Sequence, residues 1–334
     1  MPIRKTLLAS GALLALFASQ TMADTTLRLS TQMPPSHHSV KALETFKSEV
    51  EDATDGSLKV QIHPAGQLFK GPDLPMAVGS GAVDMGDMVT PYVAPIYPDL
   101  ALLDGPFMVD SPEVARRLYE QDLKQVLDDR FGRLGMKVVA VHPYGYFSMY
   151  GTNARPIETP ADMKGLSIRA VDKTQILKAQ AVGAKPEAIP GSEQFMAYQR
   201  GTVDVGQTGP SSFVSRKLYE IFEHGAIIRD DLMVFFLTIN KGVWEGLTPE
   251  EQAAVEAAGQ KLSDTSWDLM LEEEKAADEF LPQHMKVVFV DHDDLQPWRD
   301  AFSGVNAKLA EDAGERGKEI FDIIVRVRTE LGAD

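Results

Sequence analysis

The chain has 334 residues, of which 44% are hydrophobic and 25% are charged, and its 49 acidic against 33 basic side chains give a formal net charge of −16. This composition is typical of a globular protein with enough apolar material for two cores, and the acidic balance argues against nucleic acid and anionic lipid as partners. The sequence contains no cysteine, which excludes disulfides, a thiol nucleophile and lipoprotein acylation.

The first 23 residues have the pattern of a secretory signal peptide. Arg4 and Lys5 precede a short apolar run at 7–17, and small residues follow up to Ala23. A membrane anchor, the alternative, would need a longer apolar run. We therefore expect cleavage after Ala23 and export to the periplasm.

The next segments alternate between strand and helix patterns. Apolar residues alternate at 26–33 and 58–65, as in half-buried strands, while those at 40–50 recur with helical spacing. Ser111 and Pro112 form a strong helix start for 111–135, and an apolar run of strand length follows at 136–145. This order predicts an α/β fold with largely parallel sheets.

An internal echo links two distant segments. "MAVGSGAVDMG" at 76–86 and "MAYQRGTVDVG" at 196–206 share six residues at identical offsets. Coincidence among common residues is one explanation, and two lobes built on similar units is the other. In the second case the residues after each echo, at 87–92 and 207–212, would face each other across one cleft, because ligands bind beyond the carboxyl ends of strands. The glycines and aspartates of the echoes are expected to serve the backbone as turn formers.

A short strand near 166–170 carries an arginine on one face. Leu166, Ile168 and Ala170 alternate toward a buried side, so Arg169 points the other way, close to the strand's end. Composition alone favours a structural salt bridge for this residue. Farther on, 247–285 and 293–331 are rich in helix formers, and long helices of this kind could brace two lobes.

Catalytic and metal-binding motifs are absent from the sequence. There is no nucleophile elbow, no H-E-x-x-H and no phosphate-binding or dinucleotide-binding glycine loop. The pair His37–His38 is interpreted as a partly exposed turn rather than a metal site, and "DHDD" at 291–294 as a solvated turn rather than a cation site. We expect no enzyme activity, no cofactor and no metal.

Four stretches together resemble one family. The segments at 63–71, 158–173, 194–210 and 244–258 ("HPAGQLFKG", "ETPADMKGLSIRAVDK", "QFMAYQRGTVDVGQTGP" and "WEGLTPEEQAAVEAA") are similar to those of the DctP-type solute-binding subunits of TRAP transporters. The resemblance implies a two-lobed periplasmic binding protein fold with a ligand cleft between lobes and long C-terminal bracing helices. It also implies a small organic acid as ligand, held by Arg169, and delivery to the small and large membrane subunits. A guanidinium matches a carboxylate bidentately, which supports that role.

Two positions depart from the family pattern. Where the family has an asparagine for the ligand, this chain has Thr208, whose hydroxyl can still donate one hydrogen bond. Where some members carry a second arginine, this chain has Met149. A single guanidinium in an apolar surrounding indicates a monocarboxylate.

The remaining ligand-contact candidates follow from position in the chain. For the aromatic ones, ordinary core packing is an equal alternative. They are Gln32, Tyr92, Tyr146, Phe147, Asp172, Gln207 and Phe213.

The predicted division gives one lobe 24–146 plus about 236–275, and the other 147–235 plus about 276–334. The favoured function is an extracytoplasmic solute receptor of a TRAP transporter, expected to be a monomer. One alternative is a binding protein for an ABC importer or chemoreceptor. The other is a periplasmic hydrolase or isomerase, which no sequence motif supports.

Overall fold

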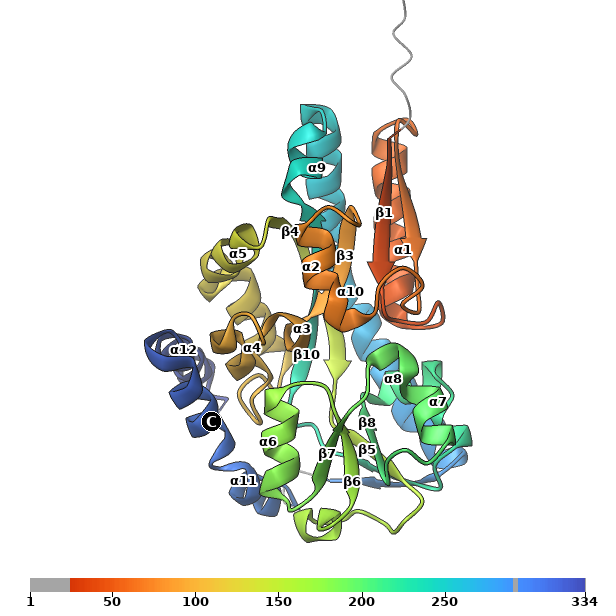
Figure 1. Ribbon diagram of the computed structural model, residues 1–334, viewed down its shortest axis with the longest axis vertical. Helices are drawn as coiled ribbons and strands as arrows, with labels where there is room; N and C mark the ends of the chain where they lie inside the picture. Colours follow the sequence, from red (N-terminus) through yellow and green to blue (C-terminus); the bar gives the residue numbers. More distant parts are fainter. Residues whose placement is uncertain (1–24, 291–293, 334) are drawn as a thin grey trace, which may run out of the picture.

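The computed structural model describes residues 25–290 and 294–333 and contains two β-sheets flanked by helices (Figure 1). The predicted signal peptide and the first three residues of "DHDD" lie outside the described residues. Among residues 25–290 and 294–333, no group of three or more His, Cys, Asp or Glu side chains is placed to hold a metal ion.

The first sheet has the strand order β2-β1-β3-β10-β4. Strands β1, β2 and β3 are parallel, whereas β10 is antiparallel to both β3 and β4. The bounds are β1 Thr25–Thr31, β2 Leu58–His63, β3 Met85–Val89, β4 Met136–Tyr146 and β10 Leu232–Asn240.

The second sheet has the order β11-β9-β5-β8-β6-β7. Strand β5 is antiparallel to both β8 and β9, while β6 is parallel to β7 and β8. The α/β class is confirmed, but both sheets are mixed rather than largely parallel. The bounds are β5 Met149–Thr152, β6 Ser167–Ala170, β7 Lys185–Ala188, β8 Val205–Thr208, β9 His224–Ile227 and β11 Lys286–Phe289.

The two echoes occupy equivalent places in the two sheets. In the first sheet β1 lies between β2 and β3, and in the second β6 lies between β7 and β8. Each echo spans a short helix and the strand after it, with a glycine of positive φ between them (Gly81 77°, Gly201 65°). The helices of the two units are α1 His38–Ala53, α2 Leu74–Gly79 and α3 Thr90–Val93, and α6 Lys173–Ala181, α7 Gln194–Gln199 and α8 Pro210–Ser215.

The echo aspartates fasten neighbouring strands. Asp84 accepts the backbone N–H of Arg28 at 2.8 Å, and Asp204 accepts that of Ser167 at 2.8 Å. Each carboxylate therefore fastens the central strand of its unit, β1 in its middle at Arg28 and β6 at its first residue, Ser167. The two aspartates were predicted to act as local turn formers. They do accept backbone N–H groups, but those groups belong to another strand.

The helical spacing at 40–50 is confirmed by α1, whose apolar stripe of Val40, Leu43, Phe46 and Val50 is fully buried. His37 and His38, at the start of this helix, were expected to be partly exposed but are buried. His37 and His38 are 1% and 2% exposed because His37 caps α1 through Nδ1, which accepts the Ser39 N–H at 3.2 Å.

The predicted helix at 111–135 is interrupted. It consists of α4 Pro112–Arg117, a π-helical turn η3 Leu118–Asp122 and α5 Lys124–Arg133. The Leu123 N–H bonds back to the Leu118 carbonyl at 2.8 Å, so one extra residue is accommodated in the middle of the segment.

Two short passages join the sheets, at 147–148 between β4 and β5 and at 228–231 between β9 and β10. The predicted division after residue 146 falls at the first of these passages. The predicted division after residue 235 falls inside β10, where residues 235–237 are fully buried. The lobe boundaries themselves stay a prediction.

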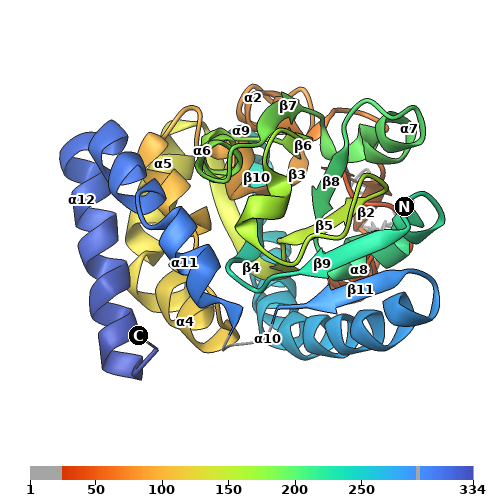
Figure 2. The same cartoon turned by 90° about the horizontal axis from the view of Figure 1, so that it is seen from below.

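The late helices follow different paths. Helix α10 Pro249–Phe280 packs on α1 and β4 beside the first sheet and on α8 beside the second, so it spans both. Helix α12 Val305–Leu331, which breaks at Gly314 (φ 65°, ψ −148°), packs on η2 Pro98–Asp104 and α6. Figure 2 shows α12 and α11 (Gln296–Phe302) together along one side of the molecule.

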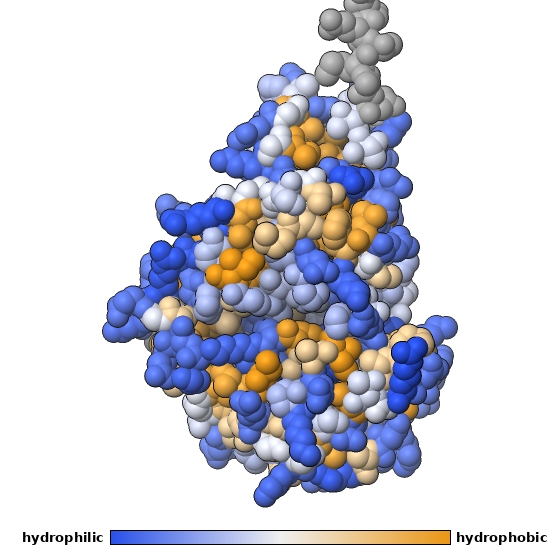
Figure 3. All heavy atoms as spheres, in the orientation of Figure 1, coloured by the Kyte–Doolittle hydropathy of each residue, from blue (hydrophilic) through white to orange (hydrophobic). Residues whose placement is uncertain are grey.

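The remaining elements are short and connect these layers. They are η1 Gly71–Asp73, η4 Pro160–Met163, η5 Gly191–Glu193, η6 Leu218–Glu220, α9 Lys241–Gly246 and η7 Leu281–Gln283. The face drawn in Figure 3 is mostly hydrophilic, with smaller apolar areas between. Among the described residues, no helix has both the length and the apolar character needed to cross a bilayer.

Candidate ligand-binding site

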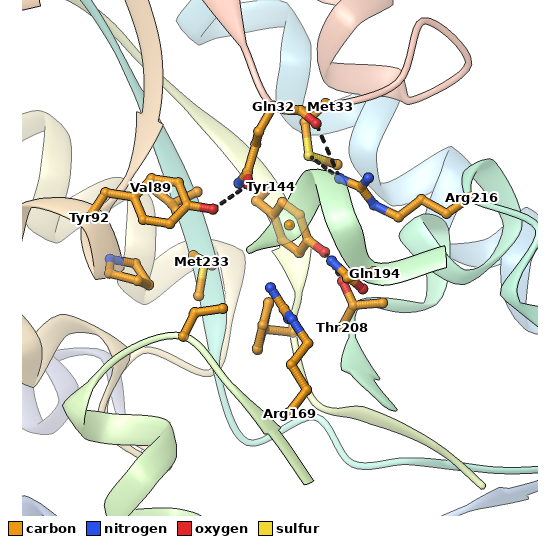
Figure 4. A pocket seen from close by; sticks show the side chains of 14 residues that line it. Gln32, Met33, Val89, Tyr92, Tyr144, Arg169, Gln194, Thr208, Arg216 and Met233 are labelled. Carbon is orange, nitrogen blue, oxygen red and sulfur yellow. Dashed lines mark hydrogen bonds between the residues drawn. The ribbon is translucent and has the colours of Figure 1, made fainter. Parts of the chain in front are cut away.

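Side chains from both sheets converge on one cavity (Figure 4). The first sheet supplies residues that follow β1 and β3 and lie near the end of β4, and the second supplies residues of β6, β8 and the segments beside α7 and α8. Parallel strands place their carboxyl ends at a common edge, so this location follows from the topology. The lining consists of Gln32, Met33, Val89, Pro91, Tyr92, Tyr144, Phe147, Arg169, Val171, Gly191, Gln194, Thr208, Arg216 and Met233.

Arg169 lies on β6 with its guanidinium in the cavity (Figure 4) and is 2% exposed. Its Nε donates to the Ile189 carbonyl at 2.9 Å and its Nη1 to the Gln207 carbonyl at 2.7 Å. The ring of Phe147 lies 5.8 Å from the guanidinium carbon. These contacts fix the direction of the guanidinium, but all of its fixed partners are uncharged.

This lack of a carboxylate partner distinguishes Arg169 from three other buried cations of the described chain. Arg130 pairs with Asp99 at 2.8 Å, Lys178 with Asp230 at 2.7 Å, and Arg328 with Asp110 at 2.6 Å. A buried charge is costly unless an opposite charge compensates it. The cavity is therefore suited to an anion.

A second guanidinium in the cavity was missed by the sequence analysis. Arg216 follows α8 and is partly buried; its Nη2 approaches the Gln32 carbonyl at 3.4 Å and the Met33 sulfur at 3.2 Å, while its buried Nε has no hydrogen-bond partner. Burial lowers the pKa of Arg216, and repulsion from Arg169 adds to that lowering. The premise of a single guanidinium is wrong.

A hydroxyl network joins the two sheets across the cavity. The Tyr144 hydroxyl lies 2.8 Å from the Thr208 hydroxyl, donates to Ser212 Oγ at 2.7 Å and accepts the Gly209 N–H at 3.1 Å. Thr208, predicted to donate to the ligand, lines the cavity and already has a protein partner. Its hydroxyl can serve a ligand only by sharing or exchanging that bond.

Gln32 and Tyr92 also line the cavity, as predicted, and the Tyr92 hydroxyl donates to Gln32 Oε1. Burial raises the pKa of Tyr92 to about 12, so this phenol is a neutral donor at neutral pH. Gly191 of η5 approaches the same amide: a Cβ built there would lie 2.1 Å from Gln32 Oε1. A larger residue here would have to displace the Gln32 amide from its bond to Tyr92.

The other predicted contact residues, apart from Phe147 and Arg169, do not line the cavity. Asp172 caps α6 by accepting the Gln175 N–H at 2.9 Å and borders a separate hollow beside Lys173. Gln207 contributes its backbone carbonyl to Arg169. Tyr146 packs under Arg229, and Phe213 packs on Phe222 in the core of the second sheet. Asp172 therefore has an ordinary capping role, and Tyr146 and Phe213 have ordinary packing roles.

Met149 is fully buried in that same core. Two of the missed lining residues had some signal in the sequence: Tyr144 ends an apolar strand pattern, and Gln194 begins the helix of the second echo. Arg216 had none, because nothing in its local pattern separates it from an exposed arginine.

A family model for "bacterial extracellular solute-binding protein, family 7" (DctP) matches residues 29–312 of the chain. Among curated proteins, the C4-dicarboxylate-binding periplasmic protein DctP of Rhodobacter capsulatus is 24% identical over 314 residues, which cover 92% of each chain.

Solved structures with the same fold include TRAP solute-binding proteins. One from Desulfovibrio salexigens with bound orotic acid superposes with a TM-score of 0.85 at 22% identity, covering 92% of this chain and 99% of the other. DctP7 of Bordetella pertussis, a receptor that binds pyroglutamic acid, gives 0.84 at 21% identity over 90% and 99%. At these identities the likeness establishes the two-lobed fold.

Proposed function

Because the chain belongs to the bacterial extracellular solute-binding proteins of family 7, the DctP family, we propose that it captures a small organic acid in the cavity between its two sheets and passes it to the membrane subunits of a TRAP transporter. The family consists of transport proteins that bind solutes, and it does not consist of enzymes. The chain is accordingly a binding protein that leaves its ligand chemically unchanged, and we infer that it works in the periplasm as a monomer.

The observation that carries this proposal is the buried, uncompensated guanidinium of Arg169. Its Nε and Nη1 are occupied by backbone carbonyls, which leaves the outer edge of the guanidinium for a ligand. A carboxylate placed there would form a charge-assisted hydrogen bond of the stronger kind, shielded from water by Phe147 and Tyr92. The net charge of −16 makes this local positive site necessary, since the protein's overall field repels an anion.

Capture by closure is supported by contacts that run between the two units. Ser36 Oγ donates to the Ser215 carbonyl at 2.9 Å, and Lys70 of the first unit forms an ion pair with Glu193 of the second. Together with Arg216 and Tyr144, these contacts surround the cavity with bonds that must break when the lobes separate. Ligand binding that adds contacts on both sides would favour the closed form.

The function is tested by a thermal-shift screen of residues 24–334 against a panel of organic acids and matched uncharged amides. We expect at least one acid to raise the melting temperature in a concentration-dependent way, because a ligand that binds only the folded state stabilises it by mass action. An amide or sugar panel that stabilises the protein while no acid does would contradict the proposal.

A further inference from the structure

Three consecutive glutamates on α10 differ in their surroundings. Glu272 is exposed and Glu273 is half-buried, whereas Glu274 is only 3% exposed. Glu273 forms an ion pair with Lys41 of α1 at 2.6 Å. Neither carboxyl oxygen of Glu274 has a hydrogen-bond partner among residues 25–290 and 294–333. A buried carboxylate without partners is costly, so we expect Glu274 to keep its proton in this conformation.

Glu274 lies where α10 passes from the first sheet to the second. On one side it meets Gly145 near the end of β4, where a built Cβ would lie 2.7 Å from Glu274 Oε1 and 3.6 Å from Met270 Cγ. On the other side, Ala277 of the next helical turn belongs to the core of the second sheet. Helix α8 of the second unit also packs on α10. Elements of both sheets therefore surround this carboxyl.

The two passages between the sheets also run beside Glu274. The first, at 147–148, begins directly after β4. In the second, at 228–231, Arg229 donates to Asp278 Oδ2 at 2.5 Å and its guanidinium carbon lies 5.2 Å from the ring centre of Tyr146. Asp278 is one helical turn after Glu274 on α10. A rotation of the lobes about these passages would therefore act at Glu274.

The titratable side chains near Glu274 come from α1, β4, the second passage and α10 itself, since α8 contributes only serine, proline and apolar residues. The charged ones are joined in two ion pairs, Lys41 with Glu273 and Arg229 with Asp278. The other two are neutral at pH 7, because burial lowers the pKa of His38 to about 4 and raises the pKa of Tyr146. Each nearby charge thus already has an opposite charge beside it.

We propose that Glu274 couples closure of the lobes to the uptake of one proton, being a neutral acid in the closed protein and a carboxylate when the lobes are apart. This inference rests on the proposed function, in which an organic acid closes the cavity. Separation of the lobes would part α8 from the end of β4 and admit water to the carboxyl. A hydrated glutamate is ionised at neutral pH.

The sign of the effect follows from burial. In the closed form burial raises the pKa of Glu274 from an ordinary 4.5 to about 8, against the lowering effects of Ser211 and Arg229. Its contribution to the closed form is thus fully present below the ordinary pKa and is lost as the pH rises through about 8. Binding of an organic acid at pH 7 should take up about one proton, and its affinity should fall about tenfold from pH 6 to pH 7.

A purely structural role for Glu274 makes a different prediction. If its carboxyl stays buried when the lobes separate, it carries its proton in both forms, and binding exchanges no proton with it. Replacing Glu274 by glutamine, which has nearly the same shape and cannot ionise, then leaves the pH dependence of binding unchanged.

The experiment is calorimetry of residues 24–334 with the organic acid that raises the melting temperature most in the thermal-shift panel. Titrations at pH 7 in two buffers with different heats of ionisation count the protons taken up, and titrations at pH 6, 7 and 8 give the affinity. We expect the wild type to take up about one proton more than Glu274→Gln, whose affinity should lack the tenfold fall. Glu273→Gln, the same change at the neighbouring residue, should behave as the wild type does.

Two results would overturn the inference while the proposed function stands. One is the same proton uptake in Glu274→Gln as in the wild type. The other is a wild type whose affinity does not change between pH 6 and pH 8, which needs no variant to fold. If no organic acid binds at all, the proposed function fails, and this inference fails with it.

Discussion

Neutralising Asp104 should make the protein's stability less dependent on pH. Asp104 ends η2, is 3% exposed, and neither of its carboxyl oxygens has a hydrogen-bond partner. Burial raises its pKa well above the ordinary value, and the nearby carboxylates of Asp172 and Asp231 raise it further, against the lowering effect of Lys178. Burial raises the pKa of Tyr119 well above its ordinary value, and the nearby Asp104 raises it further.

Two nearby carboxyls, whose pKa values are also raised by burial, show the scale of such a contribution. Burial raises the pKa of Asp172 and of Asp231 to about 6, from an ordinary 3.8. A carboxyl that binds its proton more tightly in the folded state stabilises the fold fully below the unfolded pKa, and that contribution is lost as pH rises through the folded pKa. Asp172 and Asp231 therefore each lower the free energy of unfolding by roughly 1 kcal/mol between pH 5 and pH 8.

Asp104→Asn removes one negative charge from this group. We expect it to flatten the fall in the free energy of unfolding between pH 5 and pH 8 by roughly 1–2 kcal/mol, because the folded state then no longer holds a buried carboxyl without hydrogen-bond partners that must lose its proton as the pH rises. Urea denaturation of residues 24–334 at both pH values measures this. Asp55→Asn, an exposed control in a left-handed turn that asparagine tolerates, should change little. A pH dependence that is the same in Asp104→Asn as in the wild type would refute the reasoning.

Two further changes probe the cavity wall, both by calorimetry with the acid that stabilises the protein most. Gly191→Ala should weaken binding by up to about tenfold, because its Cβ would lie 2.1 Å from Gln32 Oε1 and displace the side-chain amide that accepts from Tyr92 in the cavity; unchanged affinity would mean that the position of this amide does not matter for binding. Tyr144→Phe should weaken binding by about 1–2 kcal/mol, because it removes the hydroxyl that links Thr208, Ser212 and the Gly209 N–H; a Phe variant that binds as tightly as the wild type would exclude a role for this network.

Local periodicity explains what the sequence predicted well. The stripe of Val40, Leu43, Phe46 and Val50 is buried as its helical spacing requires. The two echoes lie in different sheets at equivalent places because each encodes the same turn and strand start. The placement of Arg169 in the cavity follows from alternation along one short strand, β6.

The misses depend on contacts between distant segments. Arg216 reaches Gln32, 184 residues earlier in the chain, and no local pattern reports such a meeting. Tyr146 and Phe213 could face the cavity or the core with the same sequence, because aromatic side chains suit both. The predicted lobe division after residue 235 falls inside β10, because this strand is buried along almost its whole length and has no alternation to mark where it begins.

The central claim is that Arg169 holds the carboxylate of the ligand. Calorimetric titration of the wild type and Arg169→Ala with the most stabilising acid tests it most directly. Arg155→Ala is the control, since Arg155 also donates to two carbonyls but lies outside the cavity.

We expect Arg169→Ala to lose about 2–5 kcal/mol of binding free energy, roughly 30-fold or more in affinity, and Arg169→Lys to recover only part, because the planar fork is lost. Arg155→Ala should bind as the wild type does. An Arg169→Ala protein that is folded and binds the acid as tightly as the wild type would contradict the account.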